Sequence, residues 1–153
     1  GFGQQGYGYN IGALYDEIGK ILGINKSYNA VLIGTGNLGQ AIVNYPGFNN
    51  SHFCIKALFD ISPKVIGTDI KGFEVLDVNQ LSEFVKSNNI DIAIICTPKS
   101  SAQDTVNELV KAGIKGIWNF ASIDLEVPED IIVENVSITD SLLTLSYLMK
   151  ESV

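Results

Sequence analysis

An apolar run that ends at three closely spaced glycines constrains the fold of this chain more than any other feature. Residues 30–39 read AVLIGTGNLG, with Gly34, Gly36 and Gly39 in the pattern G-x-G-x-x-G. Glycine is needed where the backbone turns sharply or where another group must approach it closely. A buried strand that ends at such a turn and leads into a helix is typical of a nucleotide-binding βα unit.

Each of these glycines meets a separate need in such a unit. Gly34 permits the turn out of the strand, Gly36 leaves the backbone bare for a diphosphate, and Gly39 lets the helix lie close to the sheet. We expect unpaired N–H groups of the turn and the positive end of the helix to hold the diphosphate. A tight turn without a ligand is the alternative interpretation.

The rest of the chain alternates between short apolar runs and helical stretches. Continuous apolar strands separated by helices indicate a parallel sheet that is covered on both faces. Before the first strand, Asn10 can cap a helix over 11–22. We predict an α/β domain, Rossmann-like and doubly wound, with about six mainly parallel strands. The predicted strands cover 30–34, 55–60, 73–77, 91–98, 116–120 and 130–135, and the other predicted helices cover 38–44, 79–88, 101–112 and 140–150.

Composition limits what the chain can do on its own. Its 153 residues suffice for one domain, and we expect a linker over 1–10, a binding domain over 11–138 and a terminal dimerisation helix over 139–153. A net charge of -7 without a basic cluster argues against nucleic-acid binding by this chain alone. We see no metal-ligand spacing and no membrane-spanning run, and the two cysteines suit a reducing cytoplasm.

A carboxylate at the end of the second predicted strand indicates the cofactor. Asp60 lies about 20 residues beyond the glycine motif, where a carboxylate accepts hydrogen bonds from ribose hydroxyls and repels a 2′-phosphate. We therefore predict NADH and NAD+ as cofactors. The alternative for Asp60 is a cap on the Ser62–Pro63 turn.

Ligands of open parallel sheets lie beyond the carboxyl ends of the strands, so the residues that end the fourth and fifth predicted strands should line the same crevice. Core packing is the alternative for Phe120 and Cys96, and we favour it for Cys96. The predicted cofactor-binding residues are Gly34, Thr35, Gly36, Asn37, Leu38, Gly39, Asp60, Ile61, Cys96, Thr97, Pro98, Asn119, Phe120 and Ala121.

The sequence predicts a cofactor site but no reaction. Hydride transfer requires a proton donor or acceptor near the nicotinamide, usually a histidine. His52, the only histidine, precedes the second predicted strand and should lie at the amino edge of the sheet, away from the ligand. We therefore expect a binding or sensing domain and no enzyme. The alternatives are a fragment of an NAD-dependent oxidoreductase and a coenzyme A-binding domain.

Longer motifs resemble those of Rex, a family of redox-sensing transcriptional repressors of bacteria. The likeness runs nearly from end to end, through GYGYNI, GTGNLGQAIVNYPGF, FDISP, NNIDIAIICTP, AGIKGIWNFAS, VPEDIIVENV and LSYLMK. The resemblance implies a homodimer whose subunits carry an amino-terminal winged-helix domain for operator DNA and a Rossmann-like domain for NADH or NAD+. It also implies that NADH releases the repressor from DNA, and that the chain begins at the interdomain junction without the winged helix.

The resemblance further implies roles for residues near a dimer interface. Tyr45 of NYPGF is expected near the nicotinamide, where it links cofactor state to domain orientation; closing the preceding helix is its alternative role. Ser137 stands where the family has an acidic partner of this tyrosine, and Asp140, one turn further along, is the candidate to substitute for that partner. Ser122 replaces a proline, and Ile138 replaces an aromatic residue that enters the partner's nicotinamide pocket in some members.

The carboxyl-terminal helix of this family is exchanged between subunits, and the sequence supports a similar arrangement independently. Apolar residues occupy too much of the circumference of the predicted helix for it to cover only its own sheet. A terminal helix docked on its own domain is the alternative. The apolar residues concerned are Leu142, Leu143, Leu145, Leu148 and Met149.

Overall fold

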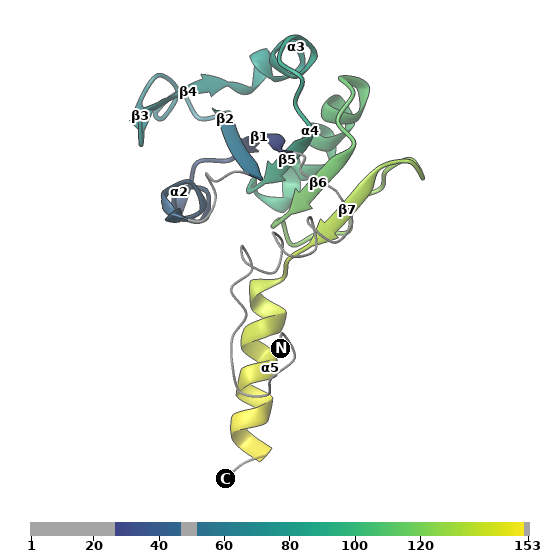
Figure 1. Cartoon of the computed structure of the whole chain (residues 1–153). Helices are drawn as coiled ribbons and strands as arrows, with labels where there is room; N and C mark the ends of the chain where they lie inside the picture. The colour runs from purple at the N-terminus through teal and green to yellow at the C-terminus, as the bar shows by residue number, and fades with distance from the viewer. Residues whose placement is uncertain (1–26, 47–51, 152–153) are drawn as a thin grey trace.

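The computed structural model describes residues 27–46 and 52–151, so the predicted linker over 1–10 and the predicted helix over 11–22 lie outside the described residues. Within these residues, helices cover both faces of a seven-stranded sheet (Figure 1). The elements are β1 (Tyr28–Ile33), α2 (Asn37–Asn44), β2 (Phe53–Asp60), β3 (Asp69–Ile70), β4 (Phe73–Asp77), the 3-10 turn η2 (Val78–Gln80), α3 (Leu81–Ser87), β5 (Ile92–Ile95), α4 (Lys99–Lys111), β6 (Gly116–Asn119), β7 (Ile132–Asn135) and α5 (Ile138–Glu151).

The strand order confirms the predicted doubly wound fold. The sheet runs β3-β4-β2-β1-β5-β6-β7, and all neighbouring strands are parallel except β3 and β4. If β3 is left out and the other six strands are numbered along the chain from one to six, the order becomes 3-2-1-4-5-6, which is the Rossmann order. The order reverses between β1 and β5, and such a reversal opens a crevice at the carboxyl ends of the strands.

Alternate residues of the central strand enter two separate cores. Val31 and Ile33 pack with residues of α3 and α4 on one face of the sheet. Leu32 packs with residues of α2 on the opposite face. All three side chains are fully buried, and burial of each contributes about 1.5–3 kcal/mol. Burial on both faces explains why residues 30–33 of β1 form an unbroken apolar run in the sequence.

The structure adds one strand that the sequence analysis missed. β3 is only two residues long and pairs antiparallel with β4 through the two-residue turn Lys71–Gly72. Both turn residues have positive φ, 51° and 87°, as a type I′ hairpin requires. The Asp69 carboxylate also accepts a hydrogen bond from the Gly72 N–H. Two residues are too few to show an alternating pattern, so this strand leaves no periodic signal.

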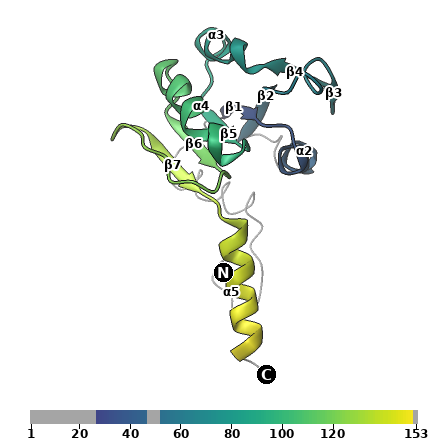
Figure 2. The ribbon, with the colours of Figure 1, turned by 180° about the vertical axis from the view of Figure 1, so that it is seen from behind.

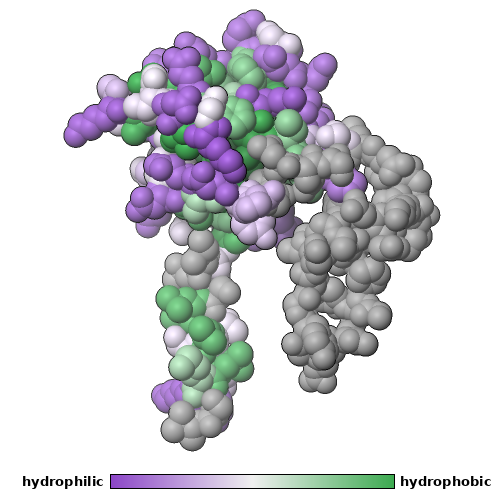
Figure 3. Space-filling view, turned by 60° about the vertical axis from the view of Figure 1, so that its left-hand side comes forward, coloured by the Kyte–Doolittle hydropathy of each residue, from purple (hydrophilic) through white to green (hydrophobic). Residues whose placement is uncertain are grey.

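α5 extends away from the sheet as a separate helix. It stands apart from the sheet in opposite views, and apolar side chains cover much of its surface (Figures 1, 2 and 3). The large apolar residues of α5 whose side chains the structure describes are all exposed, between 53% for Leu145 and 63% for Tyr147. The helix therefore does not dock on the described part of its own domain, and exposed apolar surface of this kind marks an interaction site. No described helix is both long and apolar enough to span a bilayer.

Candidate functional site

A pocket of about 770 Å³ lies at the reversal of the strand order, beyond the carboxyl ends of the central strands. Its volume falls within the range of about 300–1,000 Å³ that is usual for ligand sites. The turns that follow β1, β2, β5 and β6 form its wall. Ten of the predicted cofactor residues line it: Gly34, Gly36, Leu38, Asp60, Ile61, Cys96, Thr97, Pro98, Phe120 and Ala121.

The three glycines of the motif occupy three different environments. Gly34 has a φ of +101°, and a Cβ there would lie 2.5 Å from the carbonyl oxygen of Cys96. A Cβ on Gly39 would overlap the carbonyl oxygen of Gly34. Gly36 differs, because it lines the pocket and no heavy atom beyond its chain neighbours lies within 4 Å of its Cβ position. Gly34 and Gly39 are thus required by the fold, whereas Gly36 leaves room for a ligand.

The amino end of α2 is suited to an anion. Gly36 is the N-cap residue, no side chain caps the helix, and the first turn contains no acidic residue. The first N–H groups of a helix have no partner within the helix, and the helix dipole makes this end partly positive. A diphosphate placed over Gly36 would therefore find hydrogen-bond donors and a favourable potential.

The Asp60 carboxylate ties the glycine turn to the turn after β2. One oxygen accepts hydrogen bonds from the Thr35 N–H at 2.8 Å and the Thr35 hydroxyl at 2.6 Å. The other accepts from the backbone N–H groups of Ile61 at 2.7 Å and Ser62 at 3.0 Å. These four bonds use about the full acceptor capacity of a carboxylate. The alternative role of Asp60 as a turn cap is therefore present, and its contact with a ribose stays a prediction.

These hydrogen bonds also govern the protonation of Asp60. Burial raises the pKa of the carboxyl, but the bonds from Thr35, Ser62 and Ile61 together outweigh burial and hold the pKa below its ordinary value of 3.8. The folded state thus binds this proton less tightly than the unfolded state does. The contribution to stability is complete above pH 3.8 and is lost as the pH falls through the lowered pKa.

Replacing Asp60 by asparagine tests this coupling. At pH 7 we expect Asp60→Asn to lower the free energy of unfolding by about 1 kcal/mol, because hydrogen bonds to a charge are lost at a partly exposed site. Below pH 3.8 the difference from the wild type should shrink. Urea unfolding between pH 7 and pH 3 measures the loss of stability and its dependence on pH. Asp104→Asn, at an exposed position of α4, serves as the control. A difference in unfolding free energy that stayed constant across this pH range would contradict a lowered pKa of Asp60.

Two predicted site residues support the pocket wall from behind. Thr35 is buried and holds Asp60 as described. Asn119 is buried at the end of β6; its side-chain oxygen accepts from the Ala121 N–H, and its amide group donates to the Ile123 carbonyl and to the Asn135 side chain. Both residues therefore position the wall, and neither lies in it.

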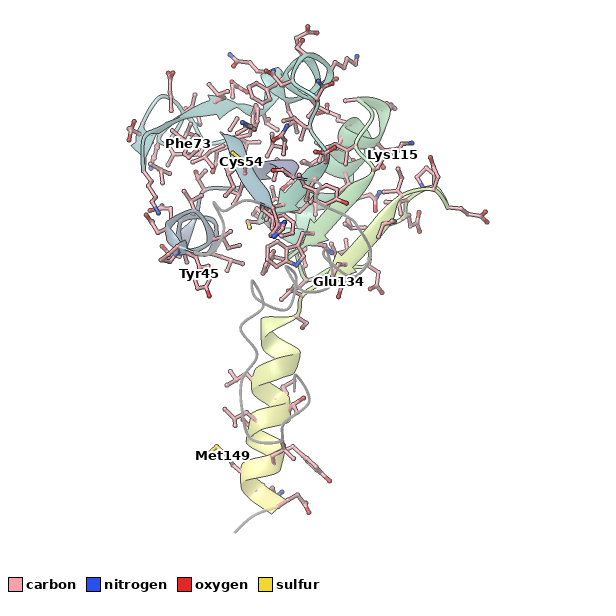
Figure 4. The ribbon with its side chains drawn as sticks, in the orientation of Figure 1. Tyr45, Cys54, Phe73, Lys115, Glu134 and Met149 are labelled. Carbon is pink, nitrogen blue, oxygen red and sulfur yellow. The ribbon has the colours of Figure 1, made fainter. Side chains whose placement is uncertain are left out.

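The structure does not bring the other predicted site residues into the wall of the pocket. Asn37 is exposed on the first turn of α2, and Gly39 packs against the glycine turn. Tyr45 lies at the carboxyl end of α2 and is 60% exposed (Figure 4). Its predicted place near the nicotinamide stays a prediction. The side chains of Ile138 and Asp140 lie outside the described residues.

The wall beyond β5 and β6 is mainly apolar. Burial raises the pKa of the Cys96 thiol to about 12, so this side chain is uncharged and unreactive at neutral pH. Phe120 packs edge-on against Trp118 with ring centroids 4.7 Å apart. The Thr97 hydroxyl oxygen is buried and has no hydrogen-bond partner among the described residues. This end of the pocket suits an uncharged ring with few polar groups.

Four residues of the wall were not predicted from the sequence: Ile33, Ser62, Lys99 and Ser122. Each adjoins a predicted residue at a strand end, so extending each strand-end segment by one or two positions would have included them. His52 lies where the sequence predicts. Its carbonyl accepts a hydrogen bond from the N–H of Tyr28, the first residue of β1, at the edge opposite to the pocket.

Comparison with known families agrees with this architecture. Residues 25–123 match the family model described as "CoA binding domain". Together with the strand order and the pocket at its reversal, this match places the chain in the class of Rossmann-like nucleotide-binding domains.

Relatives that match nearly the whole chain identify its family within this class. The redox-sensing transcriptional repressor Rex of Clostridioides difficile is 66% identical over 99% of this chain and 72% of its own length. The chain belongs to the Rex family. The structure of RSP, a Rex-family repressor, with NAD+ and operator DNA matches with a TM-score of 0.82 and 55% identity, over 99% of this chain and 70% of that one. RSP with NADH matches with a TM-score of 0.83 and 53% identity, over 95% and 71%.

Proposed function

We propose that this chain is the NADH- and NAD+-sensing domain of a bacterial transcriptional repressor and acts in the cytoplasm. The pocket at the strand reversal carries this proposal, because Gly36 there leaves bare backbone at the amino end of α2. Rex relatives and the RSP complexes with NADH, NAD+ and operator DNA support it. The predicted cofactor residues and the division into 1–10, 11–138 and 139–153 form part of the proposal.

Within this proposal, the cofactor regulates DNA binding and undergoes no reaction. The oxidised nicotinamide ring is cationic and the reduced ring is neutral, so the apolar wall formed by Pro98, Phe120 and the uncharged Cys96 favours NADH through desolvation. A ligand shifts a two-state equilibrium only by its difference in affinity for the two states. A nearly complete switch between dimer arrangements requires about 5 kcal/mol. DNA contact is assigned to an amino-terminal winged-helix domain.

Thermal unfolding with different nucleotides tests the proposal. At 100 times the dissociation constant, NADH should stabilise the domain by about 2.7 kcal/mol, which raises Tm by roughly 5–10 °C at this size. NAD+ should give a smaller shift at the same concentration, and NADPH almost none, because a 2′-phosphate would lie near the Asp60 carboxylate. Absence of a shift with both NADH and NAD+ at millimolar concentration would refute a sensing role.

Coenzyme A is the second candidate ligand, because the matching family model is described as a CoA-binding domain. Coenzyme A carries a 3′-phosphate on its ribose, and the negative Asp60 at the pocket wall disfavours it. The same thermal series decides between the two candidates. Stabilisation by coenzyme A that exceeds stabilisation by NADH would favour the second one.

A further inference from the structure

The pocket has one charged group of each sign among the described residues that line it. Asp60 lies at the end of β2, and Lys99 is the first residue of α4, just after β5. Lys99 is exposed, and no described carboxylate forms an ion pair with it. The first turn of α4 contains no acidic residue, so the positive end of the helix dipole adds to the charge of the lysine. The pocket therefore has a negative end and a positive end.

The strand order determines which part of a dinucleotide meets each end. This step rests on the proposed function. The sheet runs β2, β1, β5, β6 across the pocket, and Gly36 marks the place of the diphosphate after β1. The adenosine then lies on the β2 side, near Asp60. The nicotinamide lies on the opposite side, beyond β5 and β6, where Lys99, Pro98 and Phe120 form the wall.

We propose that Lys99 helps to select the reduced cofactor by repelling the positive charge of the oxidised nicotinamide ring. NADH and NAD+ share the same diphosphate, so attraction between Lys99 and the diphosphate raises both affinities by the same factor. The two cofactors differ by one unit of charge on the ring. The residues around Lys99 cannot offset the repulsion, because Cys96, Pro98 and Phe120 carry no negative charge. Selection by charge thus adds to selection by desolvation.

The expected size of the effect follows from Coulomb's law. Two unit charges within one pocket, at an effective dielectric constant between that of a protein surface and that of water, change an equilibrium by about three- to tenfold. Lys99 is exposed, so added salt should weaken the effect.

Binding of three ligands to two matched variants tests the proposal. Lys99→Gln removes the charge in the pocket, and Lys111→Gln makes the same change in the last turn of the same helix, away from the pocket. Calorimetry with NADH, NAD+ and ADP-ribose gives the affinities, and Lys99→Arg keeps the charge. The ratio of NADH affinity to NAD+ affinity should fall about three- to tenfold in Lys99→Gln only. ADP-ribose, which lacks the nicotinamide, should change by the same factor as NADH.

The other outcomes of this experiment would contradict the proposal. If Lys99→Gln weakens all three ligands equally, the lysine contacts the phosphates and the proposal of redox selection is wrong. It is equally wrong if Lys99→Gln leaves the ratio unchanged or if Lys111→Gln changes it as much. A wild-type chain that bound neither NADH nor NAD+ would overturn the proposed function as well. Wild-type binding therefore distinguishes failure of the proposed function from failure of the Lys99 proposal alone. Thermal unfolding of the unliganded variants shows whether Lys99→Gln has kept its fold.

Discussion

Replacing Gly36 by alanine is expected to weaken NADH binding about tenfold to a hundredfold while leaving the fold intact. The new methyl group would meet no protein atom within 4 Å, but it would occupy the space over the bare backbone of the pocket. A diphosphate displaced from this position loses at least one charge-assisted hydrogen bond, which costs about 1.5–3 kcal/mol. The φ of -71° at Gly36 also suits alanine. Loss of a favourable N-cap and gain in backbone rigidity roughly cancel, so stability should stay within about 1 kcal/mol.

Two further glycine variants separate ligand contact from folding. Gly39→Ala should destabilise the domain by at least the roughly 1–3 kcal/mol that is typical of overpacking, because its methyl group would overlap the carbonyl oxygen of Gly34. Gly116→Ala lies at the amino end of β6, where its nearest neighbours are 3.5 and 3.6 Å from the Cβ position, and it should change neither property greatly. Calorimetry with NADH and urea unfolding measure the two effects. Wild-type NADH affinity in Gly36→Ala would show that the diphosphate lies elsewhere.

Placing acidic residues on the exposed apolar surface of α5 is expected to convert the proposed homodimer into monomers. Leu142 and Leu145 lie on one side of the helix and are 61% and 53% exposed in the single chain. Burying one leucine contributes about 1.5–3 kcal/mol, so four such residues per dimer account for about 6 kcal/mol or more. The double variant Leu142→Glu with Leu145→Glu should therefore raise the dimer dissociation constant by more than about a thousandfold.

A control with the same change in charge makes this result specific. Lys150→Glu lies in the last turn of the same helix and also changes the net charge by two units. It should leave the dimer intact, apart from a small unfavourable interaction with the helix dipole of about 0.3–1 kcal/mol. Sedimentation equilibrium of the three proteins measures the change. A double variant that stayed dimeric would show that another surface holds the subunits together.

The sequence predicted the parts of the fold that long-range burial dictates. β1, β2 and β5 lie between two helical layers, so nearly all their residues are apolar and the pattern is unambiguous. Boundaries were less certain where polar groups decide them. The predicted helix over 79–88 begins instead with the turn η2, because the Asp77 side chain accepts a hydrogen bond from the Asn79 N–H. β3 was missed because its two residues depend on a hairpin turn and not on a pattern.

The site was predictable where the backbone decides it and less so where side chains interact. The packing roles of Gly34 and Gly39 follow from the spacing, and the structure shows the close contacts that they require, whereas the contact of Gly36 with a diphosphate stays a prediction. The bond from the Ser62 N–H to Asp60 matches the turn cap that the sequence offers as an alternative, but the bonds from Thr35 were not predictable, because they form only once β1 and β2 pair in parallel. Lys99 was overlooked for a similar reason. A lysine that follows a proline reads as a solvated surface residue until the position of the pocket is known.

The buried Asn119 has a consequence for how motion can spread through this molecule. Its side chain holds the Ala121 segment of the pocket and, through Asn135, the last residue of β7, while its carbonyl accepts from the Val136 N–H. α5 starts only two residues after Val136. These hydrogen bonds therefore join the far wall of the pocket to the residues directly before α5. A small rotation at the base of α5 displaces its far end more than its base, because the helix is fourteen residues, or about 21 Å, long.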